Sequence, residues 1–373
     1  MKDAIIAARN NISRFVYQLL FKPVFFNFDP ESVHDRICGF GEFLGKFRVT
    51  RLKVRLLFYY SNKKLEQEIL GIKFENPIGL AAGFDKNARL TDILPNVGFG
   101  FCEVGSITGD PCEGNPKPRL WRLKKSKGLV VWYGLTNEGS VKIAKRLKGK
   151  KFNFPLGTNI AKTNSIKTVS DKAGIEDYVK AFSEFTSIGD YFTINISCPN
   201  AYGGQPFTEP GRLDKLLSQI DKIPTTKPIF LKLSPDLAKK QLEDILKVVE
   251  KHRIDGFICT NLTENRNNKK IVDKGLPEHG GISGKVVEEL SNDAISYIYK
   301  KTKGKYLIIG LGGVFSAEDA YKKIKAGASL VQLITGMIFV GPQLISDINM
   351  GLVSLLQKDG YSNISQAIGV DNK

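Results

Sequence analysis

Eight short apolar runs follow one another along residues 76–335, and polar or glycine-rich segments separate them. They are NPIGLAAG (76–83), FGFCEVGSI (99–107), PLGTNI (155–160), YFTINIS (191–197), PIFLKLS (228–234), GFICTN (256–261), YLIIGLGG (306–313) and LVQLIT (330–335). Near-continuous apolarity over four to eight residues is typical of a strand that is buried on both faces. Most segments between the runs have helical spacing, as in residues 236–252, where apolar positions repeat at intervals of three and four.

Eight strand–helix units in one chain predict a closed parallel (β/α)8 barrel, the TIM barrel, within the α/β class. The alternative is a doubly wound open sheet, which is expected to carry its glycine-rich phosphate turn after the first strand. The clearest such turn, GLGG at 310–313, follows the seventh run instead. The barrel is therefore favoured. A further helix is predicted over 316–328, beginning at a capping Ser316 and ending at Gly327.

Residues 1–65 differ from the rest and predict a small N-terminal helical domain ahead of a barrel domain over 66–373. Asp29 is a plausible N-cap with Pro30 at the first helical position. The preceding stretch, ISRFVYQLLFKPVFF, sets large apolar side chains around Arg14 and Lys22. This basic, amphipathic segment fits an interfacial helix pair at a membrane, or equally a helical hairpin packed on the barrel.

Composition removes several classes of protein. The chain has 373 residues, 42% of them hydrophobic, and no apolar run approaches the roughly 20 residues needed to cross a bilayer. Its five cysteines are widely spaced and form no CxxC pair, which argues for a reducing compartment and against a disulfide framework or a zinc site. We expect no metal. With only three histidines, any base or nucleophile is expected to be Cys, Ser, Lys or a carboxylate.

The charge balance is the one unusual number. Fifty-five Lys and Arg against 38 Asp and Glu give a net charge of +17, which implies attraction to something anionic. Nucleic acid, a membrane surface and a phosphorylated ligand all fit, and so does a general enrichment in lysine. No nucleic-acid motif is present, so we expect no nucleic-acid partner.

In a barrel of this kind the chemistry lies at the carboxyl ends of the strands. Those ends lack the paired carboxylates of a glycosidase, and they are rich in Lys, Asn, Ser, Thr and Gly. Such a lining suits an organic ligand with carbonyls and ring nitrogens. Glycines after the seventh run, the Thr335–Gly336 pair after the eighth, and GISG at 281–284 in the loop after the sixth predict a phosphate site.

Three side chains at these ends are candidates for chemistry. Lys86 and Lys232 end different strands at one mouth, where one could hold a substrate carboxylate and the other could stabilise negative charge on a cofactor ring. Either could instead pair with Asp85 or Asp236. Cys198 follows a strand within the polar NISCPN segment, which favours a catalytic thiol over a buried apolar one.

The segments AAGFDKN, EVGSITGDPCEGNPKPRLWRL, NISCPN, FLKLSPD, GGISGK, IGLGGV and QLITGMIF, in this order and spacing, resemble the dihydroorotate dehydrogenases. The N-terminal LLFKPVFFNFDPESVHD is similar to the membrane-associated, quinone-reducing class 2 branch. The resemblance covers residues 14–358. It implies FMN-dependent oxidation of (S)-dihydroorotate to orotate in pyrimidine biosynthesis, with a quinone as electron acceptor, at the cytoplasmic face of the cell membrane.

The resemblance also implies roles for individual residues. Cys198 would remove the C5 proton while hydride passes from C6 to N5 of the flavin, and Lys232 would stabilise the reduced flavin. FMN would lie against Ala81, Ala82, Gly83, Ser106, Asn159, Asn195, Lys232, Thr260, Gly284, Gly312, Gly313, Ile334, Thr335 and Gly336. The substrate would be held by Lys86, Gly134, Leu135, Asn195, Asn200 and Asn261, and the quinone would enter near His34 and Arg122.

Three positions depart from the class 2 pattern. Cys198 stands where that branch has serine, and is the residue of the soluble class 1 enzymes. Val131 replaces an asparagine that grips the substrate, and Leu262 replaces a threonine. Asn137 and Thr263 are neighbouring polar residues that could compensate. A related cyclic amide as substrate, an acceptor other than quinone, and a basic binding protein on an inactive barrel remain as alternatives.

Overall fold

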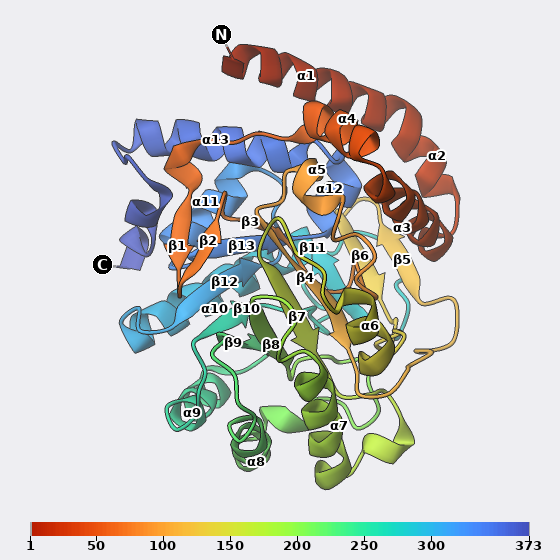
Figure 1. Cartoon of the computed structure of the whole chain (residues 1–373), viewed down its shortest axis with the longest axis vertical. Coiled ribbons are helices and arrows are strands. Elements are labelled where there is room, and N and C mark those ends of the chain that lie inside the picture. Colours follow the sequence, from red (N-terminus) through yellow and green to blue (C-terminus); the bar gives the residue numbers. More distant parts are fainter. Residues whose placement is uncertain (1, 373) are drawn as a thin grey trace.

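The computed structural model describes residues 2–372, and its centre is a closed barrel of eight parallel strands (Figure 1). The strands are β3 (Ile78–Leu80), β4 (Phe101–Ile107), β7 (Leu156–Ile160), β8 (Tyr191–Asn195), β9 (Ile229–Leu233), β10 (Gly256–Cys259), β12 (Leu307–Leu311) and β13 (Leu330–Leu333), and neighbours in this order pair around the barrel. Each lies within one of the eight predicted runs. The predicted fold is confirmed.

Helices surround the barrel between its strands. They are α5 (Leu94–Val97), α6 (Ser140–Leu147), α7 (Asp171–Glu184), α8 (Pro210–Ile220), α9 (Lys239–Val249), α10 (Glu288–Thr302), α11 (Ala317–Lys325), α12 (Thr335–Val340) and α13 (Leu344–Lys358). Ser316 caps α11 as predicted, because its side chain accepts a hydrogen bond from the Asp319 backbone N–H at 3.2 Å. Helix α9 is shorter than predicted because Asp236 serves the next loop, where its carboxylate accepts a hydrogen bond from Glu264 N at 2.7 Å.

The barrel interior changes from apolar to polar toward the carboxyl ends of the strands. At one end Phe101, Tyr191, Phe230 and other large apolar side chains form a closed cluster. Register then places Asn195 of β8 directly beside Lys232 of β9. The polar mouth therefore rests on a packed apolar base that keeps its side chains in place.

Two small sheets lie outside the barrel. Strands β1 (Gln67–Ile69) and β2 (Ile72–Phe74) form an antiparallel hairpin. Strands β5 (Leu120–Leu123), β6 (Gly128–Val131) and β11 (Gly281–Gly284) form an antiparallel sheet in the order β11-β6-β5. The GISG segment, predicted as part of a loop, is thus strand β11, and pairing with β6 supplies its backbone hydrogen bonds.

The N-terminal helices cover one end of the barrel beside α12, α13 and the β5–β6 hairpin (Figure 1). They are α1 (Lys2–Val16), the π-helical turn η1 (Tyr17–Phe21), α2 (Lys22–Asn27), α3 (Pro30–Lys46) and α4 (Arg48–Phe58). Asp29 caps α3 as predicted, accepting from Ser32 N at 2.8 Å. A buried ion pair between Glu31 and Arg119, 2.8 Å apart, joins α3 to the segment just before β5. None of the helices in residues 2–372 is long and apolar enough to cross a membrane.

Short 3-10 helices complete the described chain. They are η2 (Lys63–Leu65), η3 (Ile166–Thr168), η4 (Pro206–Thr208), η5 (Lys285–Val287), η6 (Ile364–Ala367) and η7 (Val370–Asn372). Of these, η4 follows the loop that carries Cys198, and η5 follows β11 next to the cavity described below.

Candidate active site

One continuous cavity of about 600 Å³ runs from the polar mouth of the barrel to the space between the N-terminal helices. At the barrel end it is lined by Cys198, Lys232 and Thr260, and at the outer end by Phe40 and Phe58. The volume lies within the range of sites for organic ligands and cofactors. A polar end and an apolar end in one cavity can receive two chemically different ligands.

The structure brings together almost all of the predicted site residues. The cavity is lined by Ala81, Ala82, Gly83, Ser106, Asn195, Lys232, Thr260, Gly284, Gly312, Gly313, Ile334, Thr335 and Gly336, by Lys86, Gly134, Leu135, Cys198, Asn200 and Asn261, and by His34 and Arg122. Asn159 alone among the predicted residues is not part of the lining. It lies directly behind Ser106, whose hydroxyl donates a hydrogen bond to Asn159 Oδ1 at 2.5 Å.

A chain of polar side chains crosses the barrel mouth and orients its amides. Asn195 Oδ1 accepts hydrogen bonds from the Ser197 N–H and hydroxyl at 3.1 and 3.0 Å, while Asn195 Nδ2 donates to Ser106 Oγ at 3.0 Å. Beyond Ser106, Asn159 Nδ2 donates to the carboxylate of Glu103 at 3.0 Å, inside the barrel. Because each member has a fixed partner, the free N–H of Asn195 has a defined direction at the cavity wall.

Two ammonium groups, that of the buried Lys232 and that of the partly buried Lys86, enter the cavity without a hydrogen-bond or ion-pair partner in the described chain. Among residues 2–372, neither Lys86 Nζ nor Lys232 Nζ has a hydrogen bond or an ion pair with another side chain or the backbone. Lys86 Nζ lies 3.4 Å from the ring centroid of Tyr133, and burial lowers the pKa of Lys86 to about 8. Burial also lowers the pKa of Lys232, against the attraction of Glu103. Unpaired buried charge is costly, so both groups indicate an anionic or electron-rich ligand.

The alternative in which these lysines pair with nearby aspartates is wrong. The Asp85 carboxylate accepts hydrogen bonds from the backbone N–H groups of Arg89 and Leu90, both at 2.8 Å. Asp236 is bonded to Thr263 and to Glu264. The Asp85 carboxylate is therefore used by its own loop, and that of Asp236 by the loop after β10.

Cys198 lies at the polar end of the cavity, three residues beyond the end of β8. Its thiol is free. Burial raises the pKa of Cys198 to about 11, although the Asn200 backbone N–H and the Lys232 ammonium group act in the opposite direction. A thiol with positive charge beside it can exchange a proton with a bound ligand.

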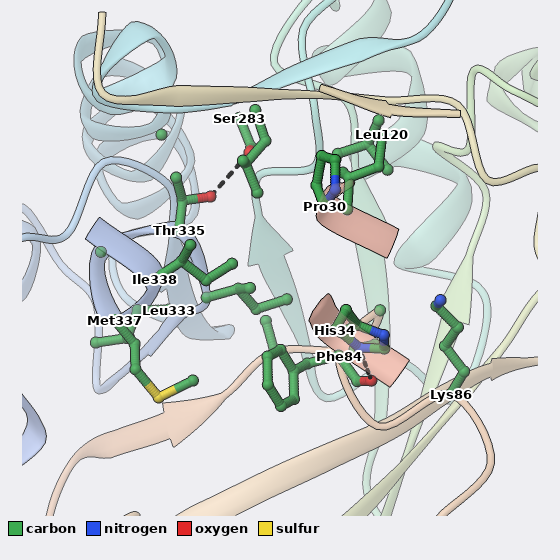
Figure 2. A pocket seen from close by; sticks show the side chains of 18 of the residues that line it. Pro30, His34, Phe84, Lys86, Leu120, Ser283, Leu333, Thr335, Met337 and Ile338 are labelled. Carbon is green, nitrogen blue, oxygen red and sulfur yellow. Dashed lines mark hydrogen bonds between the residues drawn. The ribbon is translucent and has the colours of Figure 1, made fainter. Parts of the chain in front are cut away.

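Glycines and hydroxyls form the side of the cavity near α12. Gly312 and Gly313 follow β12 with φ values of +125° and +74°, a conformation that side-chain-bearing residues rarely adopt. Thr335 begins α12, and its hydroxyl lies 2.8 Å from that of Ser283 on β11. Figure 2 shows this Ser283–Thr335 pair apart from His34 and Lys86. This side has the donors and the open backbone that suit a phosphate group.

The outer part of the cavity is apolar apart from two predicted residues. His34 Nε2 lies 2.9 Å from the Phe84 carbonyl oxygen, which gives this nitrogen the donor role (Figure 2). Arg122 donates to the Phe28 carbonyl at 2.8 Å and stacks over the Phe26 ring, 4.8 Å from its centroid. Phe21, Phe25, Ile37, Leu44 and Val54 are among the apolar residues that line this part. An apolar ring with polar substituents fits this environment.

The family described as Dihydroorotate dehydrogenase matches residues 64–356. This chain belongs to the dihydroorotate dehydrogenase family. It is 40% identical to the dihydroorotate dehydrogenase (quinone) of Christiangramia forsetii over 91% of this chain and 99% of that one. It is 36% identical to the enzyme of the same name from Trichodesmium erythraeum, over 96% of this chain and 99% of that one. The crystal structure of a dihydroorotate dehydrogenase from Eimeria tenella in complex with ferulenol aligns with a TM-score of 0.80, at 31% identity over 92% of this chain and 96% of that one.

Dihydroorotate dehydrogenases are flavin-dependent, and the polar end of the cavity fits such a cofactor. Thr260 Oγ1 is buried there without a hydrogen-bond partner in the described chain, as is the ammonium group of Lys232. A flavin ring offers carbonyls and ring nitrogens to such donors, and its phosphate matches the glycine and hydroxyl side. The residues present therefore fit the group.

Two of the three departures, Val131 and Leu262, lie on the cavity wall near the residues that follow Cys198. Val131 of β6 lies opposite Gly281 of β11. Leu262 and Pro199 occupy the space beside Gly281, where a side chain on that residue would contact them. Val131 and Leu262 thus face the cavity from one patch. The polar neighbours do not compensate: Asn137 Nδ2 donates to Thr108 Oγ1 at 2.7 Å, the Thr263 hydroxyl is bonded to Asp236, and neither residue lines the cavity.

Sequence reasoning missed several polar residues of the site. Glu103 is the one carboxylate within the apolar run 99–107, and a charged residue in a buried strand could have been recognised from the sequence as part of a polar site. Lys162 and Asn115 carry no local signal, because their partners Tyr202 and Asn200 lie about forty and eighty-five positions away. Only the folded chain brings them together.

The buried ammonium group of Lys86 predicts a pH-dependent affinity for a carboxylate ligand. An anion binds the protonated lysine, so with a pKa of about 8 the affinity for orotate should be about fivefold weaker at pH 9 than at pH 8. Lys86→Met should bind orotate weakly and without this pH dependence. Calorimetric titration with orotate at the two pH values measures both effects.

The exposed Lys73 offers a matched control, because Lys73→Met removes a charge from β2, outside the cavity. It should keep the wild-type affinity and the wild-type pH dependence. Wild-type binding by Lys86→Met would contradict the role of Lys86.

Proposed function

We propose that this chain oxidises (S)-dihydroorotate to orotate on bound FMN, with Cys198 as the base and a quinone as the electron acceptor, in de novo pyrimidine biosynthesis. The observation that carries the proposal is the convergence of Cys198, Lys86 and Lys232 in one cavity that opens between the N-terminal helices. Membership of the dihydroorotate dehydrogenase family supports oxidation of dihydroorotate as the reaction in this cavity.

The cofactor would occupy the barrel mouth. Ala81, Ala82, Gly83, Ser106, Asn195, Lys232 and Thr260 would hold the ring system, with Asn159 supporting Ser106 from behind. Gly284, Gly312, Gly313, Ile334, Thr335 and Gly336 would hold the phosphate end. When bound, FMN supplies the acceptor for the hydride that leaves C6 of the substrate. The buried charge of Lys232 favours added negative charge on the ring.

The substrate would bind between the amides and Lys86. Asn200 Nδ2 donates to the Val131 carbonyl at 2.9 Å, and Asn261 Nδ2 donates to the Ser197 carbonyl at 2.9 Å. Both side-chain carbonyl oxygens are thereby turned to other partners, and they match the ring N–H groups of a cyclic ureide. Lys86 supplies the cation for the carboxylate, and the backbone at Gly134 and Leu135 closes the same side.

Cys198 would take the proton from C5 of the substrate. The thiol, with a pKa of about 11, becomes a base as its thiolate fraction rises with pH. A serine hydroxyl ionises several units higher, so the cysteine acts as a base at lower pH than a serine at the same place. Lys232 favours the thiolate because its positive charge faces the sulfur.

Replacing the base tests its role directly. Cys198→Ala and Cys198→Ser should slow reduction of the flavin by dihydroorotate by about a hundredfold or more at pH 7, as expected for loss of a positioned base. The wild-type rate should increase with pH up to about 11, following the thiol. Anaerobic stopped-flow measurement of flavin absorbance provides both numbers.

Cys38 provides the control, since this half-buried thiol on α3 does not line the cavity. Cys38→Ser should reduce its flavin at the wild-type rate. Undiminished reduction in the Cys198 variants would exclude Cys198 as the base.

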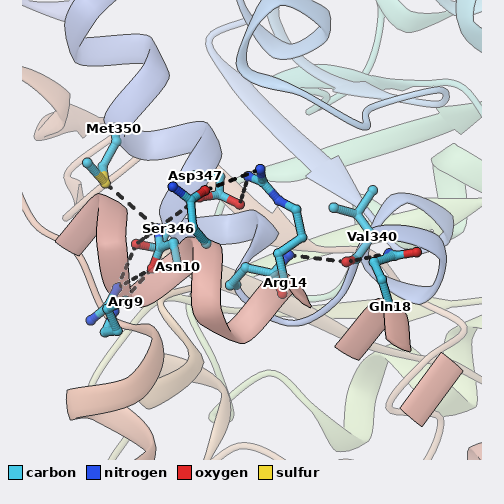
Figure 3. A network of polar contacts seen from close by, with 10 residues as sticks. Arg9, Asn10, Arg14, Gln18, Val340, Ser346, Asp347 and Met350 are labelled. Atoms are coloured by element: carbon cyan, nitrogen blue, oxygen red, sulfur yellow. Dashed lines mark hydrogen bonds and ion pairs between the residues drawn. The ribbon is translucent and has the colours of Figure 1, made fainter. Parts of the chain in front are cut away.

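The N-terminal helices would bind a membrane surface and admit the quinone, as the helical segment 1–65. Two of their polar side chains contact the helices of the barrel: Asn10 Nδ2 donates to Ser346 Oγ at 3.0 Å and Asp347 Oδ1 at 2.9 Å, and Gln18 Nε2 donates to the Val340 carbonyl at 3.0 Å (Figure 3). Their large apolar side chains face outward, and Ile12 and Phe15 are each 66% exposed. A helix on a water-exposed surface normally buries its apolar side chains and exposes its polar ones. Exposed large apolar side chains fit an apolar medium on the outer side of these helices.

The apolar end of the cavity supports the same proposal. It is lined by η1, α2, α3 and α4 and reaches His34 and Arg122, so a quinone that leaves the lipid phase would meet these two polar groups on its way inward. Residues 1–65 would then be the membrane-associating part, peripheral to the bilayer. Its location on the cytoplasmic face of the cell membrane stays a prediction.

Membrane binding is tested on α4, where Leu52 and Leu56 are 56% and 67% exposed. The double variant Leu52→Glu, Leu56→Glu should bind vesicles at least about tenfold more weakly, because two leucines no longer enter the apolar phase. Flotation with lipid vesicles measures the bound fraction. Ile166→Glu, at a 76% exposed position on the barrel, is the control and should float like the wild type. Equal flotation of all three proteins would contradict the anchor.

A second candidate substrate follows from the apolar patch of Val131 and Leu262 beside Cys198. A polar ring atom that faces this patch would lose a hydrogen bond, at a cost of about 1–3 kcal/mol. A related cyclic amide with an apolar group at that edge would not lose a hydrogen bond there. The site therefore also supports an FMN-dependent oxidation of such a compound.

An anaerobic titration of the purified flavoprotein separates the two substrates. We expect dihydroorotate to bleach the flavin absorbance, and Val131→Asn with Leu262→Thr to lower the dihydroorotate concentration at half-maximal rate of bleaching by about fivefold or more. A yellow protein that dihydroorotate does not bleach would favour the related cyclic amide. A protein without flavin would contradict both.

A further inference from the structure

The loop of residues 198–204 carries Cys198 and is held to the rest of the protein through its backbone. The Asn200 carbonyl accepts a hydrogen bond from Asn115 Nδ2 at 3.1 Å. The Tyr202 N–H donates to Asn164 Oδ1 at 2.7 Å, and the Tyr202 carbonyl accepts from Lys162 Nζ at 2.9 Å. The Tyr202 side chain itself is 57% exposed. Polar contacts, rather than side-chain packing of Tyr202, therefore anchor this part of the loop.

Lys162 is the charged member of this anchor, and its position is unusual. It follows β7 by two residues and is 4% exposed, yet it has no ion pair among residues 2–372. Besides the Tyr202 carbonyl it reaches Thr168 Oγ1 at 3.4 Å. The neighbouring carboxylate of Asp177 accepts from the N–H and hydroxyl of Thr163, both at 2.7 Å, rather than from Lys162.

The fold makes room for this lysine. Gly174 of α7 lies beside its alkyl chain, and a Cβ at Gly174 would come within 3.0 Å of Lys162 Cδ. The alkyl chain therefore passes close over the helix and delivers the ammonium group to the loop. A buried cation is costly when it is not paired, and burial lowers the pKa of Lys162. A methionine would fill the same space without that cost.

We propose that Lys162 is a positioning residue for Cys198: its ammonium group holds the 198–204 loop closed over the cavity and adds positive charge on the side of the thiol. The proposal rests on the proposed role of Cys198 as the base. Lys162 is not assigned any contact with substrate or cofactor, since it does not line the cavity.

The charged and titratable groups around the thiol agree with this role. Lys232 faces Cys198 from β9 and Lys162 faces it from the end of β7, and both lower the pKa of the thiol against the effect of burial. Cys112, in the loop after β4, acts in the opposite direction. On α7, Asp177 faces Lys162 and Tyr178 lies near Cys198, with the Tyr178 hydroxyl donating to the Asn195 carbonyl at 2.8 Å. Loss of Lys162 would remove one of two cations that favour the thiolate.

The test compares Lys162→Met with Lys227→Met in the full-length flavoprotein. Lys227 is a matched control: it is also partly buried and donates to two backbone carbonyls, those of Phe185 and Ile188 at 3.1 and 2.7 Å, but it does not line the cavity or touch the 198–204 loop. Lys162→Arg keeps the positive charge and serves as the conservative variant.

Two readouts do not depend on turnover. Hydrogen exchange followed by mass spectrometry should show peptides that contain residues 198–204 exchanging about tenfold faster in Lys162→Met, and unchanged in Lys227→Met. The rate of Cys198 alkylation by iodoacetamide, followed from pH 8 to 10, below the pKa of the thiol, should reach a given value at a pH about half a unit or more higher in Lys162→Met. Lys162→Arg should stay close to the wild type in alkylation.

Flavin reduction at saturating dihydroorotate completes the test, with a loss of about tenfold expected in Lys162→Met and none in Lys227→Met. Wild-type exchange and alkylation in Lys162→Met would overturn the proposal, and so would equal effects in the two methionine variants. If Cys198→Ala reduced its flavin normally while Lys162→Met still loosened the loop, the assignment of the base would fail and the holding of the loop by Lys162 would be supported.

Discussion

Closure of eight parallel strands into a barrel is the constraint on which the site depends. Closure leaves no free sheet edge and brings all eight carboxyl ends to one mouth. Register then decides which side chains meet there, and it sets Asn195 beside Lys232 although the two are far apart in the chain. Beneath them, large apolar side chains such as Phe101 and Phe230 fill the barrel and prevent the mouth from collapsing inward. The geometry of the polar end is thus a consequence of packing in its apolar base.

The polar end of the cavity contains positive charges that no carboxylate of the described chain neutralises. Lys232 is buried and Lys86 partly buried, and neither has a carboxylate partner in the described chain, while Asp85 and Asp236 accept hydrogen bonds from backbone and hydroxyl groups of loops. An unpaired buried cation opposes folding and favours binding of an anion. The strand and helix framework tolerates this because the site is small relative to the core. The unpaired cations of the site therefore favour ligand binding at a cost in local stability.

The helical cover gives the cavity its second, apolar end. The buried Glu31–Arg119 ion pair fixes α3 beside β5. Tyr17 and Gln18 of η1 donate hydrogen bonds to carbonyls in the last turn of α12. The first turn of α12 lies at the glycine side of the cavity. The cover and the cofactor end are therefore parts of one packed unit. An apolar ligand that enters between the helices and a polar ligand at the mouth share a single enclosed space.

The sequence by itself determined the local features. All eight strands were found from apolar runs, and the caps at Asp29 and Ser316 from side-chain type and position, because these signals depend only on neighbours along the chain. Of the site residues that the resemblance implied, all but Asn159 line the cavity. Only the tertiary structure decided that Asn159 supports Ser106 from behind, that GISG forms a strand, that Val131 and Leu262 share one wall, and that Lys162 holds the loop of Cys198. Burial, register and contacts across dozens of residues arise from how the elements pack, and no local pattern in the chain encodes them.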